Sequence, residues 1–218
     1  SAMRMVFEIN SLKNATPATV SRAGILYINE TDIGWRPFVE TWVHNRGSAS
    51  EKNFLPGLFD RYVDTLVEMT RKGYKEVTRL RVINKVCTIA YLLEGILPLI
   101  PEDKMTADVL EMAFCFCAMW AFGGPMVVDK SGDYRKKFSE DFSSIFNTKF
   151  PKDGGLCFDY FFDPESLEYV HWNTKVSPHK SVPIGNAQGQ SPFNSLFVET
   201  VETTRMSYLL DNLVRNGR

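Results

Sequence analysis

Apolar residues recur at helical spacing through the middle of the chain. One series covers residues 58–67, and a second covers residues 83–97 and ends at Pro98. In both, apolar positions lie three or four residues apart, which is the spacing of one face of an α-helix. Residues 109–122 (VLEMAFCFCAMWAF) are apolar nearly all round, and Gly123-Gly124-Pro125 follows them. This stretch predicts a central helix surrounded by the others.

The second half of the chain continues with a helix, a hairpin and another helix. Residues 134–146 carry an aromatic side chain at every fourth position, which predicts an amphipathic helix. Residues 156–162 and 167–172 alternate aromatic and polar residues around the turn formers 163–166, so we expect a β-hairpin. A final helix is predicted by the spacing of Met206, Leu209, Leu210 and Leu213. The pattern indicates a mainly α fold, built on a bundle of about five helices.

Short β-prone runs occur near the two ends of the chain. Residues 5–9 (MVFEI) and 25–28 (ILYI) predict two strands, the second of the buried kind found in parallel sheets. Between them, Thr16 as N-cap, Pro17 at the first helical position and Gly24 as the exit predict a short helix. Residues 177–192 are rich in Gly, Pro, Ser and Asn and predict an exposed connector. The strand-like run SLFVET follows at residues 195–200.

Composition narrows the classes of partner. A net charge of −1 and a pI near 6.3 provide no overall field toward nucleic acid or an anionic membrane, so we expect neither as a partner. The cysteines lack the paired spacing of a metal site and predict the reduced thiols of an intracellular protein. No uninterrupted apolar run reaches the roughly 18 residues of a membrane span. The N-terminal residues lack the layout of a signal peptide.

Local motifs for catalysis are weak. Residues 124–131 (GPMVVDKS) nearly fit the phosphate-loop pattern, but Asp129 stands where the second glycine belongs and would repel phosphate. A plain turn between helices is therefore the better interpretation. The three histidines, His44, His171 and His179, stand apart from one another, so we predict no metal site.

A basic stretch leaves two interpretations open. Residues 71–85 gather six Lys and Arg residues around Tyr74, which is compatible with a surface that follows a phosphate backbone. Glu68 and Glu76 lie among these cations and balance part of their charge. The balance favours a solvated helix boundary over a nucleic-acid surface.

Several stretches resemble one protein family. Residues 5–35 (MVFEINSLKNATPATVSRAGILYINETDIGW) look like the end of the large subdomain in the second AAA+ module of axonemal dynein heavy chains. The run FCAMWAFGG (116–124) resembles the W-x-x-G-G helix of that module's small subdomain, and FDYFFDPESLEYVHW (158–172) its hairpin. Residues 191–218 resemble the segment before the phosphate loop of the third module. The resemblance covers essentially the whole chain.

The resemblance implies roles for individual residues. Arg22 corresponds to an arginine finger that reaches the ATP of the preceding, first module, where its fixed charge would stabilise the transferring phosphoryl group. Asn10, with Glu8 as an alternative, falls about where the family places a polar sensor of the γ-phosphate. The sensor-two arginine is replaced around Met119 and Trp120, which suggests nucleotide binding without efficient hydrolysis. Residues 197, 198 and 200 would lie beside the adenine of the third module; they are Phe197, Val198 and Thr200.

The resemblance also implies an organisation and a function. Residues 1–34 would end a large subdomain, 35–150 form the helical small subdomain, 151–192 the hairpin and connector, and 193–218 start the third module. Ser1 and Ala2 look like a vector remnant, so we expect an excised piece of a longer chain.

The expected parent is an ATP-driven, minus-end-directed microtubule motor of the ciliary axoneme, in the cytoplasm and cytoskeleton. It would use ATP or ADP with Mg²⁺, and its partners would be its own neighbouring modules, microtubules and other dynein chains. The piece alone should bind no cofactor and hydrolyse no ATP, since it contains no phosphate loop and no Walker-B acid. The alternative is a non-enzymatic helical domain that binds another protein through its aromatic faces.

Overall fold

The structure is a computed structural model that describes residues 5–146, 150–151, 154–178 and 197–217. It divides into two units, Ser1–Gly34 and Trp35–Arg218. The domain limit expected at residue 192, most of the connector at 177–192 and the first two residues of SLFVET lie outside the described residues.

The first unit contains two short helices. Helix α1 (Pro17–Arg22) begins as expected, because the Thr16 side chain accepts a hydrogen bond from the Thr19 backbone N–H at 3.3 Å and Pro17 occupies the first turn. The chain leaves this helix through Ala23, whose backbone is extended, so Gly24 is not the capping residue. Helix α2 spans Glu30–Ile33.

The two strands expected in this unit are absent from the described residues. Residues 5–9 and 25–28 have no regular secondary structure, and their large side chains are exposed; Leu26 and Tyr27 are each 82% exposed. A strand needs a neighbour to satisfy its backbone N–H and C=O groups and to bury one of its faces. Apolar composition fits these residues for a sheet, but the described residues offer them no partner strand. The prediction for residues 195–200 fails in the same way over residues 197–200.

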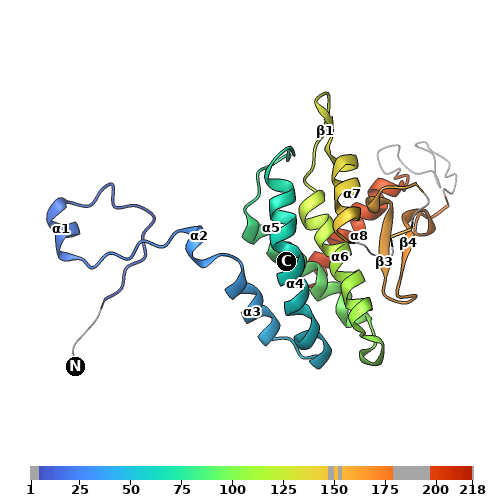
Figure 1. The fold of residues 1–218 in the computed structure, drawn as a ribbon, viewed down its shortest axis with the longest axis horizontal. Helices are drawn as coiled ribbons and strands as arrows, with labels where there is room; N and C mark the ends of the chain where they lie inside the picture. Colours follow the sequence, from blue (N-terminus) through green and yellow to red (C-terminus); the bar gives the residue numbers. More distant parts are fainter. Residues whose placement is uncertain (1–4, 147–149, 152–153, 179–196, 218) are drawn as a thin grey trace, which may run out of the picture. The chain divides into compact units, whose positions relative to one another are not determined.

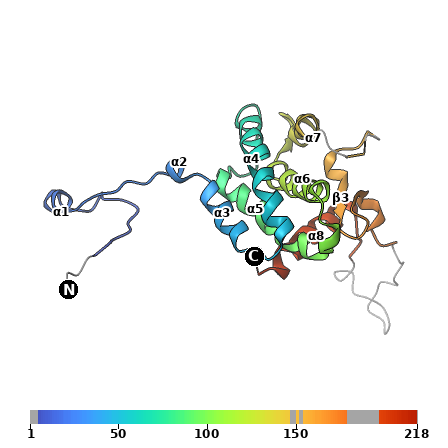
Figure 2. The same cartoon turned by 60° about the horizontal axis from the view of Figure 1, so that its bottom comes forward.

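The second unit is a helical bundle (Figures 1 and 2). Its first four helices are α3 (Arg36–His44), α4 (Ala49–Arg71), α5 (Val82–Ile96) and α6 (Ala107–Gly123). Helix α6 contacts α4, α5 and α7 and lies in the middle of the bundle (Figure 1). Every residue from position 112 to position 123 is buried. The all-round apolar stretch is therefore the central helix that the sequence predicts.

Side-chain caps fix where several helices begin. Ser48 accepts from the Glu51 N–H at 3.2 Å and Thr106 from the Val109 N–H at 3.3 Å. Asp133 does the same for α7 (Tyr134–Ile145), and Thr200 for α8 (Val201–Arg215). Each cap satisfies a backbone donor that the first helical turn leaves without a partner.

Helix α5 and the following 3₁₀ turn η1 (Leu97–Leu99) form an unusually apolar segment. Val82–Leu99 is long and apolar enough to cross a membrane by length and composition, with a mean hydropathy of 1.5. Lys85 and Glu94 interrupt it, which is why a search for an uninterrupted apolar run misses it. The segment packs against α6, and one such helix is only a weak indication of a membrane span because core helices meet the same criteria.

Two antiparallel strand pairs complete the unit. Strands β3 (Tyr160–Asp163) and β4 (Glu168–His171) form the predicted hairpin, with Tyr160 opposite His171 and Asp163 opposite Glu168. It follows the 3₁₀ turn η3 (Cys157–Asp159) and leads into η4 (Trp172–Thr174), and β3 packs on α6. Strands β1 (Val128–Asp129) and β2 (Gly132–Asp133) form a small hairpin where the sequence predicts a plain turn. With two residues each, these strands are too short to show an alternating pattern. A further 3₁₀ turn, η2, spans Glu102–Lys104.

Candidate functional site

Arg22 lies in the last turn of α1 and is exposed to solvent. The helix is held by the Thr16 cap and by side-chain bonds between Thr16 and Thr19 (2.9 Å) and from Ser21 to the Ala18 carbonyl (3.1 Å). Within the described part of the chain, no ion pair engages the Arg22 guanidinium. The C-terminal end of α1 thus presents a permanently charged group that can donate several hydrogen bonds to an anion.

The other predicted nucleotide-contacting residues belong to two different units. Asn10 is exposed and belongs to the same unit as Arg22, whereas Phe197, Val198 and Thr200 belong to the second unit. Phe197 is 67% exposed and lines a cavity of about 350 Å³ with Lys175, Tyr208 and residues of α8. The Thr200 hydroxyl accepts from the Thr203 N–H at 3.2 Å as the cap of α8. In this structure the Thr200 side chain therefore serves to cap α8.

The residues at the expected sensor-two position are inside the core. Met119 is fully buried, and Trp120 is buried and meets the Phe158 ring edge-on at 5.4 Å between centroids. Neither side chain carries a charge, and neither faces solvent. This position of α6 packs the bundle and has no cation that could stabilise a phosphate.

The near-match to a phosphate loop is the β1–β2 hairpin. Asp129 accepts hydrogen bonds from the Ser131 N–H (2.8 Å) and the Ser131 hydroxyl, and it pairs with Lys75. The hydrogen bond from Lys75 is the main reason that the pKa of Asp129 is lowered to about 2. The Asp129 carboxylate occupies the Ser131 N–H itself, and its negative charge stands where a phosphate would have to bind.

The basic stretch is partly neutralised by its own acids. Lys75 pairs with Asp129, Lys85 with Glu76 and Arg71 with Glu68. The Arg71–Glu68 and Lys75–Asp129 pairs are solvated and support the interpretation of a helix boundary, whereas Lys85 is buried with its partner. Among the described residues there is also no cluster of three His, Cys, Asp or Glu side chains suited to hold a metal ion.

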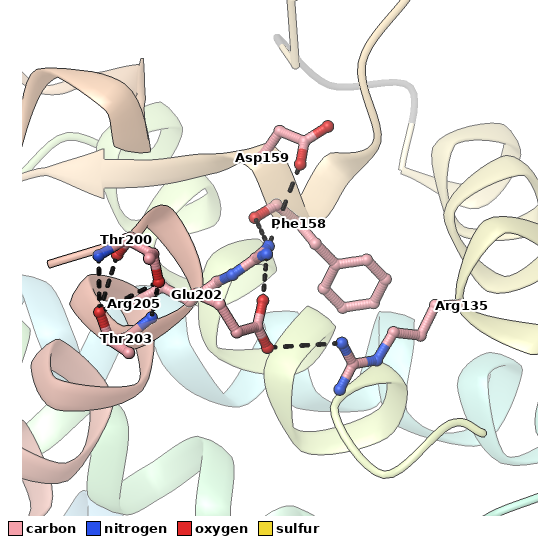
Figure 3. Close-up of polar contacts among 7 residues, drawn as sticks. All are labelled: Arg135, Phe158, Asp159, Thr200, Glu202, Thr203 and Arg205. Carbon is pink, nitrogen blue, oxygen red and sulfur yellow. Dashed lines mark hydrogen bonds and ion pairs between the residues drawn. The ribbon is translucent and has the colours of Figure 1, made fainter. Parts of the chain in front are cut away.

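A second arrangement, which the sequence did not suggest, fastens α8 to the hairpin end of the bundle (Figure 3). Arg205 donates from Nη1 to the Phe158 carbonyl at 3.0 Å and lies 4.0 Å from the Asp159 carboxylate. It also pairs with Glu202 one turn earlier, and Glu202 lies 3.7 Å from Arg135 of α7. The Arg205 side chain is only 14% exposed. One guanidinium thereby links α8 and η3, and through Glu202 it reaches α7.

Aromatic packing continues this contact along α8. Tyr208 lies 5.3 Å from the Trp172 ring and 6.0 Å from the Phe161 ring, measured between centroids. Burial raises the pKa of Tyr208 to about 12, because ionisation would place a phenolate among apolar rings. The first half of α8 is therefore held on η3 by the partly buried cation of Arg205, and on the hairpin and η4 by the partly buried ring of Tyr208.

Comparison with known proteins shows the family. Residues 55–174, more than half of the chain, match the dynein heavy chain AAA lid domain. The chain belongs to the dynein heavy chain family. It is 40% identical over 99% of its length to "Dynein beta chain, flagellar outer arm" of Chlamydomonas reinhardtii and 42% identical over 99% to "Dynein axonemal heavy chain 17" of Homo sapiens. It is 41% identical over 100% of its length to "Dynein beta chain, ciliary" of Tripneustes gratilla.

The dynein match gives the two arrangements a context. The chain spans about 5% of the length of these relatives. The matched lid runs from the first turns of α4 to the end of η4, so Arg22 precedes it and α8 follows it. Phe158, Asp159 and Arg135 belong to the lid, whereas Arg205 does not. The Arg205 contacts therefore join the dynein lid to the segment that comes after it.

Proposed function

We propose that this chain is part of an axonemal dynein heavy chain, a motor that uses ATP and Mg²⁺ to move toward microtubule minus ends and powers cilia and flagella. About 40% identity along essentially the whole chain to flagellar and ciliary dyneins is the observation that carries this proposal. The motor would work in the cytoskeleton of the axoneme, with microtubules, other dynein chains and its own AAA+ modules as partners.

Within that motor, Arg22 would act as an arginine finger of the second module toward ATP in the first. Support comes from its exposed position at the end of a capped helix and from the resemblance of residues 14–29 to the finger segment. Arginine fingers contribute roughly 10³ to 10⁵ in rate, or about 4 to 7 kcal/mol. The alternative role for Arg22, a favourable charge at the C-terminal end of a helix dipole, contributes about 0.3 to 1 kcal/mol.

Single-turnover hydrolysis in the full motor tests the finger. Arg22→Ala should slow hydrolysis at the first module by about 10³-fold or more while the ring stays assembled. Lys13→Ala removes an exposed charge from the same unit and should leave the rate unchanged. A rate for Arg22→Ala equal to that of Lys13→Ala would refute the finger. Chromatography of both variants must show the same particle size, so that loss of assembly is recognised.

The second part of the proposal is that the lid relays movement between modules. Helix α8 would begin the third module, and its contacts with η3, α7 and the hairpin would make the lid and this helix move together. Phe197 and Val198 would lie beside the adenine of that module, and Asn10 would touch the γ-phosphate in its own module. The 218-residue chain by itself should turn over no ATP, which a phosphate-release assay with the isolated chain checks directly.

A further inference from the structure

We infer that Gly95 of α5 and Asn212 of α8 are positioning residues that hold α8 on the lid in one register. Asn212 is 8% exposed and lies on the face of α8 that packs against α5. Its amide donates from Nδ2 to the Leu92 carbonyl at 3.3 Å, across 120 residues of sequence. Its neighbours on that helix face include the apolar residues Leu209 and Leu213. A polar amide in an apolar contact costs stability, and in coiled coils one such amide specifies the register of the helices.

Gly95 is the socket for this amide. A Cβ atom at position 95 would lie 1.7 Å from Asn212 Oδ1, 2.5 Å from Asn212 Cγ and 2.7 Å from Asn216 Nδ2. Real side chains do not approach that closely, so any other residue at position 95 would displace Asn212. Glycine in a helix interior costs about 0.5 to 1 kcal/mol relative to alanine. Gly95 is the next-to-last residue of α5, and the Asn212 amide of α8 lies against the helix at this position.

A second helical glycine, Gly57, serves as a comparison because no other residue lies close to the place of its missing Cβ atom. Gly57 also lies inside a helix, α4, but a Cβ atom there would meet nothing within 4 Å. Both glycines are helical, Gly57 in the interior of α4 directly after Pro56 and Gly95 in the last turn of α5. They differ in whether side chains of another helix lie against them. This makes Gly57 a matched control for the effect of alanine on helix propensity alone.

Register follows from the spacing of the two polar anchors on α8. Arg205 and Asn212 are seven residues apart, which is about two turns or 10.5 Å along the helix. They lie on the same face, and they bind different parts of the lid: Arg205 binds the Phe158 carbonyl and Asn212 the Leu92 carbonyl. A slip of one turn would move both groups by about 5.4 Å. Both hydrogen bonds would then be lost at once, and the guanidinium would stay buried without its acceptor.

The functional consequence rests on the proposed function. If the lid passes movement to the third module, the Gly95–Asn212 contact makes the direction of that movement definite, because α8 can follow the lid in only one position. Residues that set position without touching nucleotide should alter the coupling of hydrolysis to movement more than hydrolysis itself.

The test begins with the 218-residue chain and needs no motor activity. Gly57→Ala should raise the melting temperature by about 1 to 4 °C through helix propensity. Gly95→Ala should lower it, and the amides of α8 should exchange with solvent at least about tenfold faster while those of α4 keep their rates. If Gly95→Ala behaves like Gly57→Ala in both measurements, the inference is wrong.

Two further variants keep the result interpretable. Gly95→Ala combined with Asn212→Ala removes the closest clash and leaves only the flexible end of Asn216, whose Nδ2 is 2.7 Å from the added Cβ. The exchange of α8 should therefore return toward that of the Asn212→Ala single variant. A double variant that exchanges as fast as Gly95→Ala alone would overturn the socket. Asn212→Leu should keep α8 docked but give more than one set of amide resonances for α8. One sharp set would overturn the claim about register.

In the full motor, Gly95→Ala should reduce microtubule gliding velocity several-fold, with single-turnover hydrolysis close to that of the parent motor. Unchanged velocity in a variant whose α8 is released would overturn the coupling role and leave the positioning role intact. Failure of the Arg22 experiment would count against the finger alone, because neither Gly95 nor Asn212 contributes to it.

Discussion

The buried ion pair of Glu76 and Lys85 offers a direct test of how this fold is held together. The Lys85 side chain is 7% exposed and that of Glu76 is 14% exposed. The Lys85 ammonium also lies over the Phe122 ring, 5.1 Å from its centroid. Glu76 further accepts a hydrogen bond from the Leu80 N–H at 3.1 Å. Glu76→Gln keeps the shape of the side chain and an acceptor oxygen but leaves the ammonium without its counter-charge.

The size of the effect follows from burial. Removing one partner of a buried pair typically costs 3 to 5 kcal/mol. The lower end applies here, because Glu76 retains some exposure and glutamine can still accept from Lys85, so we expect Glu76→Gln to lower the free energy of unfolding by about 3 kcal/mol. For a chain of this size that corresponds to a fall in melting temperature of about 6 to 12 °C. Urea unfolding followed by circular dichroism measures it, with an unchanged m-value as the sign of an unchanged native state.

Two comparisons make the result decisive. Glu68→Gln breaks the Arg71–Glu68 pair, whose side chains are 60% and 63% exposed, and should cost less than about 1 kcal/mol. Adding Lys85→Met to Glu76→Gln removes the uncompensated charge and should recover most of the stability. If Glu76→Gln costs no more than Glu68→Gln, or if the double variant recovers nothing, the reasoning from burial is refuted.

Two other predictions concern the core. Phe142→Ala should lower the free energy of unfolding by about 3 to 5 kcal/mol, because Phe142 is fully buried and stacks on Phe138 and Phe146 at 5.3 and 4.2 Å between centroids. Phe197→Ala, at a side chain that is 67% exposed, should change this free energy by less than about 0.5 kcal/mol. Equal losses for the two variants in urea unfolding would contradict this assignment of the core. Burial raises the pKa of Cys157 to about 12 from 9.0, so the folded chain retains a proton that the unfolded chain loses. The contribution of this thiol to the free energy of unfolding should be constant below pH 9 and fall as the pH rises toward 12. A urea midpoint that is the same at pH 7 and pH 11 would contradict the second prediction.

The sequence by itself determined the helices of the bundle and the β3–β4 hairpin. Helical periodicity is a property of neighbouring residues, and it located α4, α5 and α7 without any knowledge of their partners. The all-round apolar composition of residues 109–122 was enough to place α6 at the centre, because a helix with apolar side chains on every side is stable in water only when other elements cover every side. Arg22 was placed correctly at the end of a capped helix for the same local reason.

Only the tertiary structure decided the features that depend on residues far apart in the chain. Residues 5–9 and 25–28 have the composition of strands but form none here, because a strand exists through its partner and not through its own residues. Gly95 within an apolar helix and Asn212 on an apolar helix face were visible as exceptions to their patterns, yet nothing local shows that the two meet. The two residues meet because the fold places the end of α5 against α8, where Asn212 also reaches the Leu92 carbonyl. In the same way, the fold brings the Phe158 carbonyl within hydrogen-bond distance of Arg205. Helical periodicity depends on the spacing of residues that are near one another in the sequence, whereas the close approach of two helices depends on how their side chains pack.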